Sequence, residues 1–126
     1  MCIRDSVDLR TACYEGFKAD LKRASGVICN SGFELNSECI HLGVPILTKP
    51  IDGQMEQQSN ALALQQLGFG QVMSELDSKV IWQWLTNLPQ QPQRYTPDVA
   101  KEIVSWLMNG QNTSVQEFSD KLWQQA

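Results

Sequence analysis

The sequence has no run of Lys and Arg, and its 126 residues carry a net charge of −4. A nucleic-acid-binding surface needs clustered basic side chains, so we expect no nucleic-acid partner. No apolar run approaches the roughly 20 residues of a membrane-spanning helix. The four cysteines form no C-x-x-C pair and have no histidine partner at zinc-finger spacing. This pattern predicts reduced cysteines, no bound metal and a cytoplasmic location.

The chain is long enough for one domain with a modest core. Residues 1–6 read as the translated end of a sequencing adapter, so we predict that they are an artefact and that the native protein begins upstream. Residues 7–76 are predicted to form an α/β core. Residues 77–126 are predicted to be helices that pack on the same domain.

Short apolar runs bounded by glycine alternate with helical spacing in the first part of the chain. The predicted strands cover residues 7–9, 27–29, 45–48 and 70–73, and the predicted helices cover residues 14–24, 34–42 and 54–67. Ala61, Leu64 and Leu67 should face inward. Strands and helices that alternate in this way indicate an α/β fold with a Rossmann-like parallel sheet and flanking helices.

Three further helices are expected after residue 76. Asp77 or Ser78 can cap the first, Thr96 followed by Pro97 should begin the second, and Thr113 with Gln116 forms a possible capping box for the third. The tryptophans on these helices are expected in the core rather than as sugar-binding platforms. They are Trp82, Trp84, Trp106 and Trp123.

The turn between the strand at 27–29 and the following helix is the strongest candidate for a binding site. A strand that leads through a glycine turn into a helix N-terminus directs backbone N–H groups at one point, which attracts phosphate. Gly32 would allow a diphosphate to approach the backbone. The alternative is that Ser31 and Glu34 form only a capping box.

Two further groups of polar residues extend this candidate site. Glu38 lies off the apolar stripe of its helix, where a carboxylate can accept hydrogen bonds from the vicinal hydroxyls of a ribose. The alternative for Glu38 is a solvated helix surface. Glu56 and Gln57 open a helix after a strand and suit sugar hydroxyls, or they only complement the helix dipole. The single histidine, His41, lies near a helix C-terminus and should bond the last carbonyls.

Together these motifs resemble the C-terminal donor-binding domain of a GT-B glycosyltransferase. The most similar group is the family-28-like group that includes the bacterial peptidoglycan N-acetylglucosaminyltransferase, with UDP-glycosyltransferases more distant. The resemblance runs over about residues 7–76. The motifs that carry it are residues 26–33 (GVICNSGF), Ser37 and Glu38, residues 42–45 (LGVP), Pro50, Glu56 and Gln57, and Asn60 and Ala61.

The resemblance implies a role for each matching residue. The diphosphate would face Asn30, Ser31, Gly32 and Phe33. Glu38 would hold the ribose, and the donor sugar would contact Gln54, Glu56, Gln57 and Asn60. Two positions depart from the UDP-glycosyltransferase pattern: Asn30 replaces a histidine, and Glu34 replaces an asparagine.

We therefore expect a metal-independent hexosyltransferase fragment without a cofactor, whose donor is a nucleotide-diphosphate sugar with UDP as the expected nucleotide. The acceptor pocket and any catalytic base would belong to a missing N-terminal domain, so the fragment alone should be inactive. The full-length protein would associate with the inner face of the membrane, if with any membrane. The alternatives are a nucleotide-sugar epimerase of the same architecture and a non-catalytic α/β interaction domain.

Overall fold

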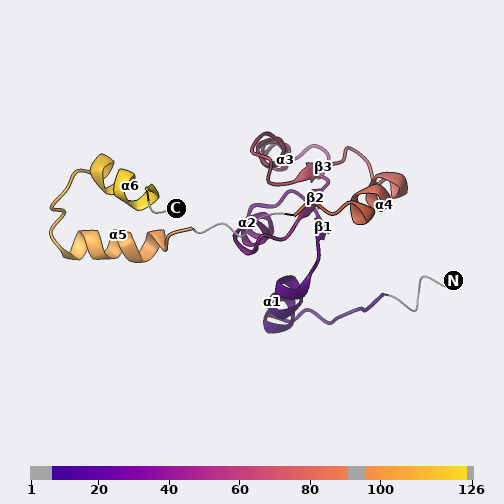
Figure 1. Cartoon of the computed structure of the whole chain (residues 1–126), viewed down its shortest axis with the longest axis horizontal. Helices are drawn as coiled ribbons and strands as arrows, with labels where there is room; N and C mark the ends of the chain where they lie inside the picture. The colour runs from indigo at the N-terminus through magenta and orange to yellow at the C-terminus, as the bar shows by residue number, and fades with distance from the viewer. Residues whose placement is uncertain (1–6, 91–95, 125–126) are drawn as a thin grey trace.

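The computed structural model describes residues 7–90 and 96–124, which include a parallel three-stranded sheet with helices on both faces (Figure 1). The prediction about residues 1–6 lies outside the described residues. The strands lie in the order β1 (Val27–Cys29), β2 (Ile46–Thr48) and β3 (Gln71–Val72). The helices are α1 (Tyr14–Arg23), α2 (Phe33–Leu42), α3 (Met55–Gln66), α4 (Ser78–Thr86), α5 (Val99–Met108) and α6 (Val115–Trp123).

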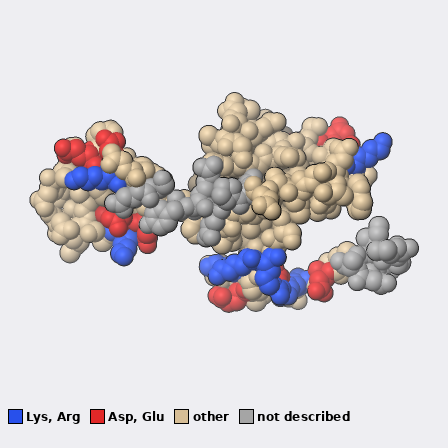
Figure 2. All heavy atoms as spheres, viewed as in Figure 1, with Lys and Arg blue, Asp and Glu red and all other residues tan. Residues whose placement is uncertain are grey.

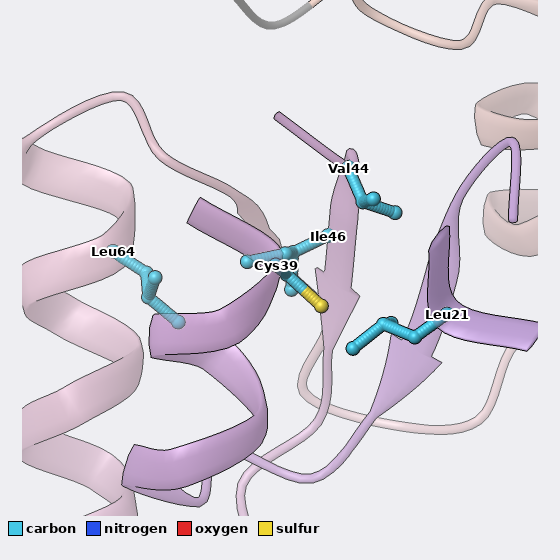
Figure 3. Close-up of a cluster of buried hydrophobic side chains, with 5 residues drawn as sticks. All are labelled: Leu21, Cys39, Val44, Ile46 and Leu64. Atoms are coloured by element: carbon cyan, nitrogen blue, oxygen red, sulfur yellow. The ribbon is translucent and has the colours of Figure 1, made fainter. Parts of the chain in front are cut away.

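Two apolar clusters cover opposite faces of the sheet, because neighbouring side chains of a strand point in opposite directions. Ile46 of β2 belongs to the cluster formed with α1, α2 and α3. Figure 3 shows this cluster, which comprises Leu21, Cys39, Val44, Ile46 and Leu64. The next residue, Leu47, packs instead with Met73 and with Trp84 of α4. The fold class predicted from the sequence, α/β with a Rossmann-like parallel sheet, is confirmed.

Local sequence signals set the end of α2 and the beginning of α4. Gly43 ends α2 with a φ of 70°, a left-handed conformation that favours glycine. The N–H of Gly43 donates to the Ile40 carbonyl, and the N–H of Val44 donates to the Cys39 carbonyl. Together these bonds satisfy carbonyls at the helix end. At α4, the Asp77 carboxylate accepts a hydrogen bond of 2.7 Å from the Lys79 N–H, as expected for its N-cap.

Two predictions in the α/β core are wrong. The segment over residues 7–9 forms no strand, because Val7 and Leu9 are 57% and 92% exposed and gain no core contact there. In α3, Ala61 and Leu64 are buried as predicted, but Leu67 is 62% exposed. The helix ends at Gln66, so the inward stripe does not extend to Leu67.

The caps of α5 and α6 differ from prediction because the expected cap residues have other partners. Asp98 caps α5, whereas the Thr96 hydroxyl lies 2.9 Å from Nδ1 of His41. Ser114 forms the capping box of α6 with Glu117, whereas the Thr113 hydroxyl accepts a hydrogen bond from the Trp106 indole N–H. The sequence therefore placed both helices correctly and their caps wrongly.

The tryptophans do not share one environment. Trp84 is buried against the sheet, whereas Trp82 and Trp123 are 67% and 53% exposed. Trp106 of α5 stacks on Phe118 of α6 with 5.3 Å between the ring centroids. The helices α5 and α6 thus pack against each other (Figure 1). That they pack on the α/β core stays a prediction.

Candidate functional site: the edge of the sheet beside the N-termini of α2 and α3

The turn over residues 30–32 leads from β1 directly into α2. Gly32 is the N-cap of α2, and within residues 7–90 and 96–124 no side-chain hydrogen bond caps the helix. The first N–H groups of an α-helix have no partner within the helix, so those of α2 are available to an anion. A Cβ built on Gly32 would meet no heavy atom of the described residues within 4 Å. The backbone here is therefore open to a ligand.

Ser31 does not form the capping box that was one reading of the sequence. Its side chain is fully buried, and its Oγ lies 2.8 Å from Oγ1 of Thr48 at the end of β2. The Thr48 hydroxyl in turn donates to the Cys29 carbonyl over 3.0 Å. Glu34 is exposed on the first turn of α2. The capping-box interpretation of Ser31 and Glu34 is thus wrong, because the serine side chain is buried and bonds Thr48 of the sheet.

Asn60 joins α3 to the same turn. Its side-chain amide donates a hydrogen bond of 3.0 Å to the Ser31 carbonyl, across 29 positions of sequence. Because β1 and β2 are parallel and pair Cys29 with Thr48, the segments that follow them leave from the same edge of the sheet. The structure therefore brings together the turn and the start of α3, both of which the sequence marked as ligand contacts.

The loop between β2 and α3 is held by its own side chains. The Gln57 side-chain oxygen accepts a 3.0 Å hydrogen bond from the Ile51 N–H. The Lys49 ammonium donates to the Pro50 carbonyl and lies 3.2 Å from the Asp52 carboxylate. Gln54 and Glu56 are exposed at the beginning of α3. Of the sugar-binding candidates, Gln57 and Asn60 thus have structural partners, whereas Gln54 and Glu56 face solvent.

Glu38 lies on α2 in a groove of about 360 Å³ between α1 and α2. The groove is lined by Lys18, Leu21, Lys22, Ser37, Glu38, His41 and Leu42. Glu38 is half-buried, and it follows Phe33 by five positions, about 7.5 Å along the helix axis. The lining of the groove includes none of residues 30–33, so the ribose-binding role of Glu38 stays a prediction.

Basic side chains face Glu38 from the opposite wall of the groove. Tyr14 is the main cause that raises the pKa of the Lys18 ammonium, and Glu38 adds to the rise. Lys18 also lies over the Tyr14 ring, 4.2 Å from its centroid. Figure 2 shows Lys and Arg gathered over α1. The wall formed by α1 thus offers positive charge beside an acidic residue.

The surroundings of Cys29, Cys39 and His41 indicate structural rather than catalytic roles. Cys39 is fully buried, and burial raises its pKa to about 12. Burial likewise raises the pKa of the Cys29 thiol, and the Thr48 hydroxyl reduces this rise. Cys39 lies in the core cluster, and Cys29 packs against it. His41 is exposed and contacts Thr96 rather than the helix carbonyls.

Within the part of the chain that the structure describes, no cluster of His, Cys, Asp or Glu could hold a metal ion. None of the described helices is long and apolar enough to cross a bilayer. Sequence reasoning did not single out Thr48. The signal that would have indicated it is a threonine at the end of an otherwise apolar strand, next to a predicted ligand loop.

Comparison with known proteins agrees with this geometry. The family model described as glycosyl transferase family 1 matches residues 4–89, more than half of the chain and the whole α/β core. An uncharacterized glycosyltransferase of Methanosarcina acetivorans is 37% identical over 54 residues, which are 43% of this chain. The match spans only 14% of that relative's length. No solved structure matches the chain significantly. On the strength of the family match, the chain belongs to glycosyl transferase family 1.

Proposed function

We propose that this chain is the donor-binding part of a GT-B glycosyltransferase and that its donor is a nucleotide-diphosphate sugar, with UDP as the nucleotide. The observation that carries the proposal is the N-terminus of α2, which has no side-chain cap and an open Gly32. An N-terminus without a capping side chain keeps its N–H groups and its positive dipole for a ligand. The non-catalytic alternative required Ser31 and Glu34 to occupy those groups.

In this proposal the ligand lies along α2. The diphosphate is held by the backbone at residues 30–33, and the ribose hydroxyls by Glu38. The donor sugar extends toward the N-terminus of α3, where Gln54 and Glu56 are exposed and where Gln57 and Asn60 order the loop and the turn. The assignments for the diphosphate, the ribose, Gln54 and Glu56 agree with the roles that the resemblance to GT-B enzymes implies. Gln57 and Asn60 differ, because their side chains bond the backbone of the chain instead.

The N-terminus of α2 stabilises the negative charge that develops on the departing nucleotide. As the bond to the sugar breaks, negative charge grows on the diphosphate, and oriented N–H groups stabilise it without having to reorganise. We therefore propose a metal-independent transfer. The acceptor pocket and the catalytic base are assigned to another domain of the same protein, which would work in the cytoplasm or at the inner face of the membrane.

Calorimetric titration of the chain with UDP tests the proposal. Glu38→Gln should weaken UDP binding by about 1–3 kcal/mol, the scale of a charge-assisted hydrogen bond, without lowering the melting temperature. Glu34→Gln is the matched control on the same helix. It should bind UDP no more weakly than the unchanged chain, because it removes a negative charge beside the diphosphate.

The outcomes separate the alternatives. A chain that does not bind UDP would contradict the donor-binding role of α2. A Glu38→Gln variant with unchanged affinity would contradict the ribose-binding role of Glu38. If the full-length protein bound UDP-sugars and released a changed sugar still attached to the nucleotide, the activity would be that of an epimerase instead.

A further inference from the structure

Two side chains hold the turn over residues 30–32: the buried Thr48 of β2 and the half-buried Asn60 of α3. We propose that Thr48 is a positioning residue for the donor diphosphate, which acts through Ser31 to hold the turn over residues 30–32 in its binding conformation. This inference rests on the proposed function, and it concerns a residue outside the motifs by which the chain resembles its family.

The direction of each hydrogen bond follows from counting hydrogens. A threonine hydroxyl has one hydrogen to donate. Thr48 donates it to the Cys29 carbonyl, which can only accept. In the 2.8 Å contact between the two hydroxyls, Thr48 must therefore be the acceptor and Ser31 the donor.

This assignment changes what Ser31 can do for a ligand. Its single hydrogen is committed to Thr48, and its side chain is 0% exposed. Its carbonyl is engaged as well, by the Asn60 amide. Ser31 therefore cannot donate a side-chain hydrogen bond to phosphate. Ser31 instead fixes the direction in which the chain enters α2. This direction makes the N–H groups at the start of α2 point outward.

Because the two hydroxyls are buried, removing the Thr48 hydroxyl has a different consequence from removing the Ser31 hydroxyl. Thr48→Val keeps the side-chain shape but leaves the Ser31 hydroxyl buried without an acceptor, and burying an unpaired donor is unfavourable. The turn should then shift so that Ser31 reaches water. Ser31→Ala leaves the donor bond of Thr48 to Cys29 intact. In the double variant neither hydroxyl remains, so the unpaired donor is absent.

The test measures UDP and uridine affinity of the 126-residue chain by calorimetry, together with backbone order parameters at Gly32 and Phe33 by NMR. Thr48→Val should weaken UDP binding by about tenfold, the effect of one lost hydrogen-bond partner. It should leave the affinity for uridine, which has no phosphate, unchanged. Order parameters at the two positions should fall from about 0.85, the value of rigid backbone.

Two further variants distinguish positioning from general loss of structure. Thr48→Ser keeps the hydroxyl and should restore UDP affinity and order at the turn. The double variant Ser31→Ala with Thr48→Val should bind UDP more tightly than Thr48→Val alone. If Ser31 were itself a phosphate ligand, Ser31→Ala would be the most damaging change, and the double variant would be no better.

Normal UDP affinity and normal order in Thr48→Val would overturn the inference and leave the proposed function standing. Equal losses of UDP and uridine affinity would also overturn it, since they would indicate damage to the fold. If the unchanged chain bound no UDP, the proposed function would fail. The order parameters would then decide separately whether Thr48 holds the turn.

Discussion

Replacing Gly32 by valine should separate ligand binding from folding. The glycine has a φ of −68° and a ψ of 147°, which any residue can adopt. In the part of the chain that the structure describes, no heavy atom lies within 4 Å of the position where a Cβ would stand. Gly32→Val should therefore destabilise the chain by at most about 1 kcal/mol, the cost of a poorer N-cap residue.

The same substitution should remove nearly all UDP affinity. A phosphate oxygen must come within about 3 Å of a backbone nitrogen to accept its hydrogen bond, and the valine methyls would occupy that approach. Hydrogen bonds to charged groups contribute about 1.5–3 kcal/mol each. Loss of two of them is at least about 3 kcal/mol, which exceeds a hundredfold in affinity.

Gly26, just before β1, provides the matched control with the opposite result. A Cβ there would lie 2.5 Å from Cη2 of Trp84 and 3.0 Å from Cδ2 of Leu88. Gly26→Ala should cost about 1–3 kcal/mol through overpacking. The remaining folded protein should bind UDP normally, because Gly26 lies at the opposite end of β1 from the turn.

Thermal melts followed by circular dichroism, together with calorimetric titration at a temperature well below the melts, check both variants. We expect a nearly unchanged melt and lost binding for Gly32→Val, and a lowered melt with retained binding for Gly26→Ala. The reasoning would be refuted if Gly32→Val bound UDP like the unchanged chain. It would also be refuted if that variant unfolded, since the space around Gly32 would then not be open.

Two more predictions concern activity and pH. The chain by itself should bind UDP weakly and release no UDP from a panel of UDP-sugars in a coupled assay; robust turnover would require a catalytic role for Glu34, His41 or Glu56. Because burial raises the pKa of Cys39 to about 12, the stability that its neutral thiol contributes is complete below its unfolded pKa of about 8.5. That stability should be lost as the pH rises toward 12. Denaturant titrations across this range should show a smaller fall in Cys39→Ala, and equal falls would contradict the assignment.

The local part of this fold was predictable from the sequence because its signals act over a few residues. The apolar run at 27–29, the helix spacing of α2 and the left-handed Gly43 each specify an element within one or two turns of chain. Alternation of such elements then implies a parallel sheet, and a glycine turn before a helix implies an anion site. Fold class and the place of the candidate site follow from these short-range rules.

Contacts between residues that are distant in sequence could be identified only from the tertiary structure. Ser31, Glu34 and their spacing fit a capping box, but Thr48, 17 positions away, takes the serine hydroxyl instead. Trp82 and Trp84 look alike in sequence, yet only Trp84 points to the sheet. A helix rotates its side chains by about 100° per residue, and the face that becomes buried depends on what the rest of the chain places against it. The sequence by itself thus determined the elements and the position of the turn, whereas packing across the sheet decided which side chains are buried and which partners they bond.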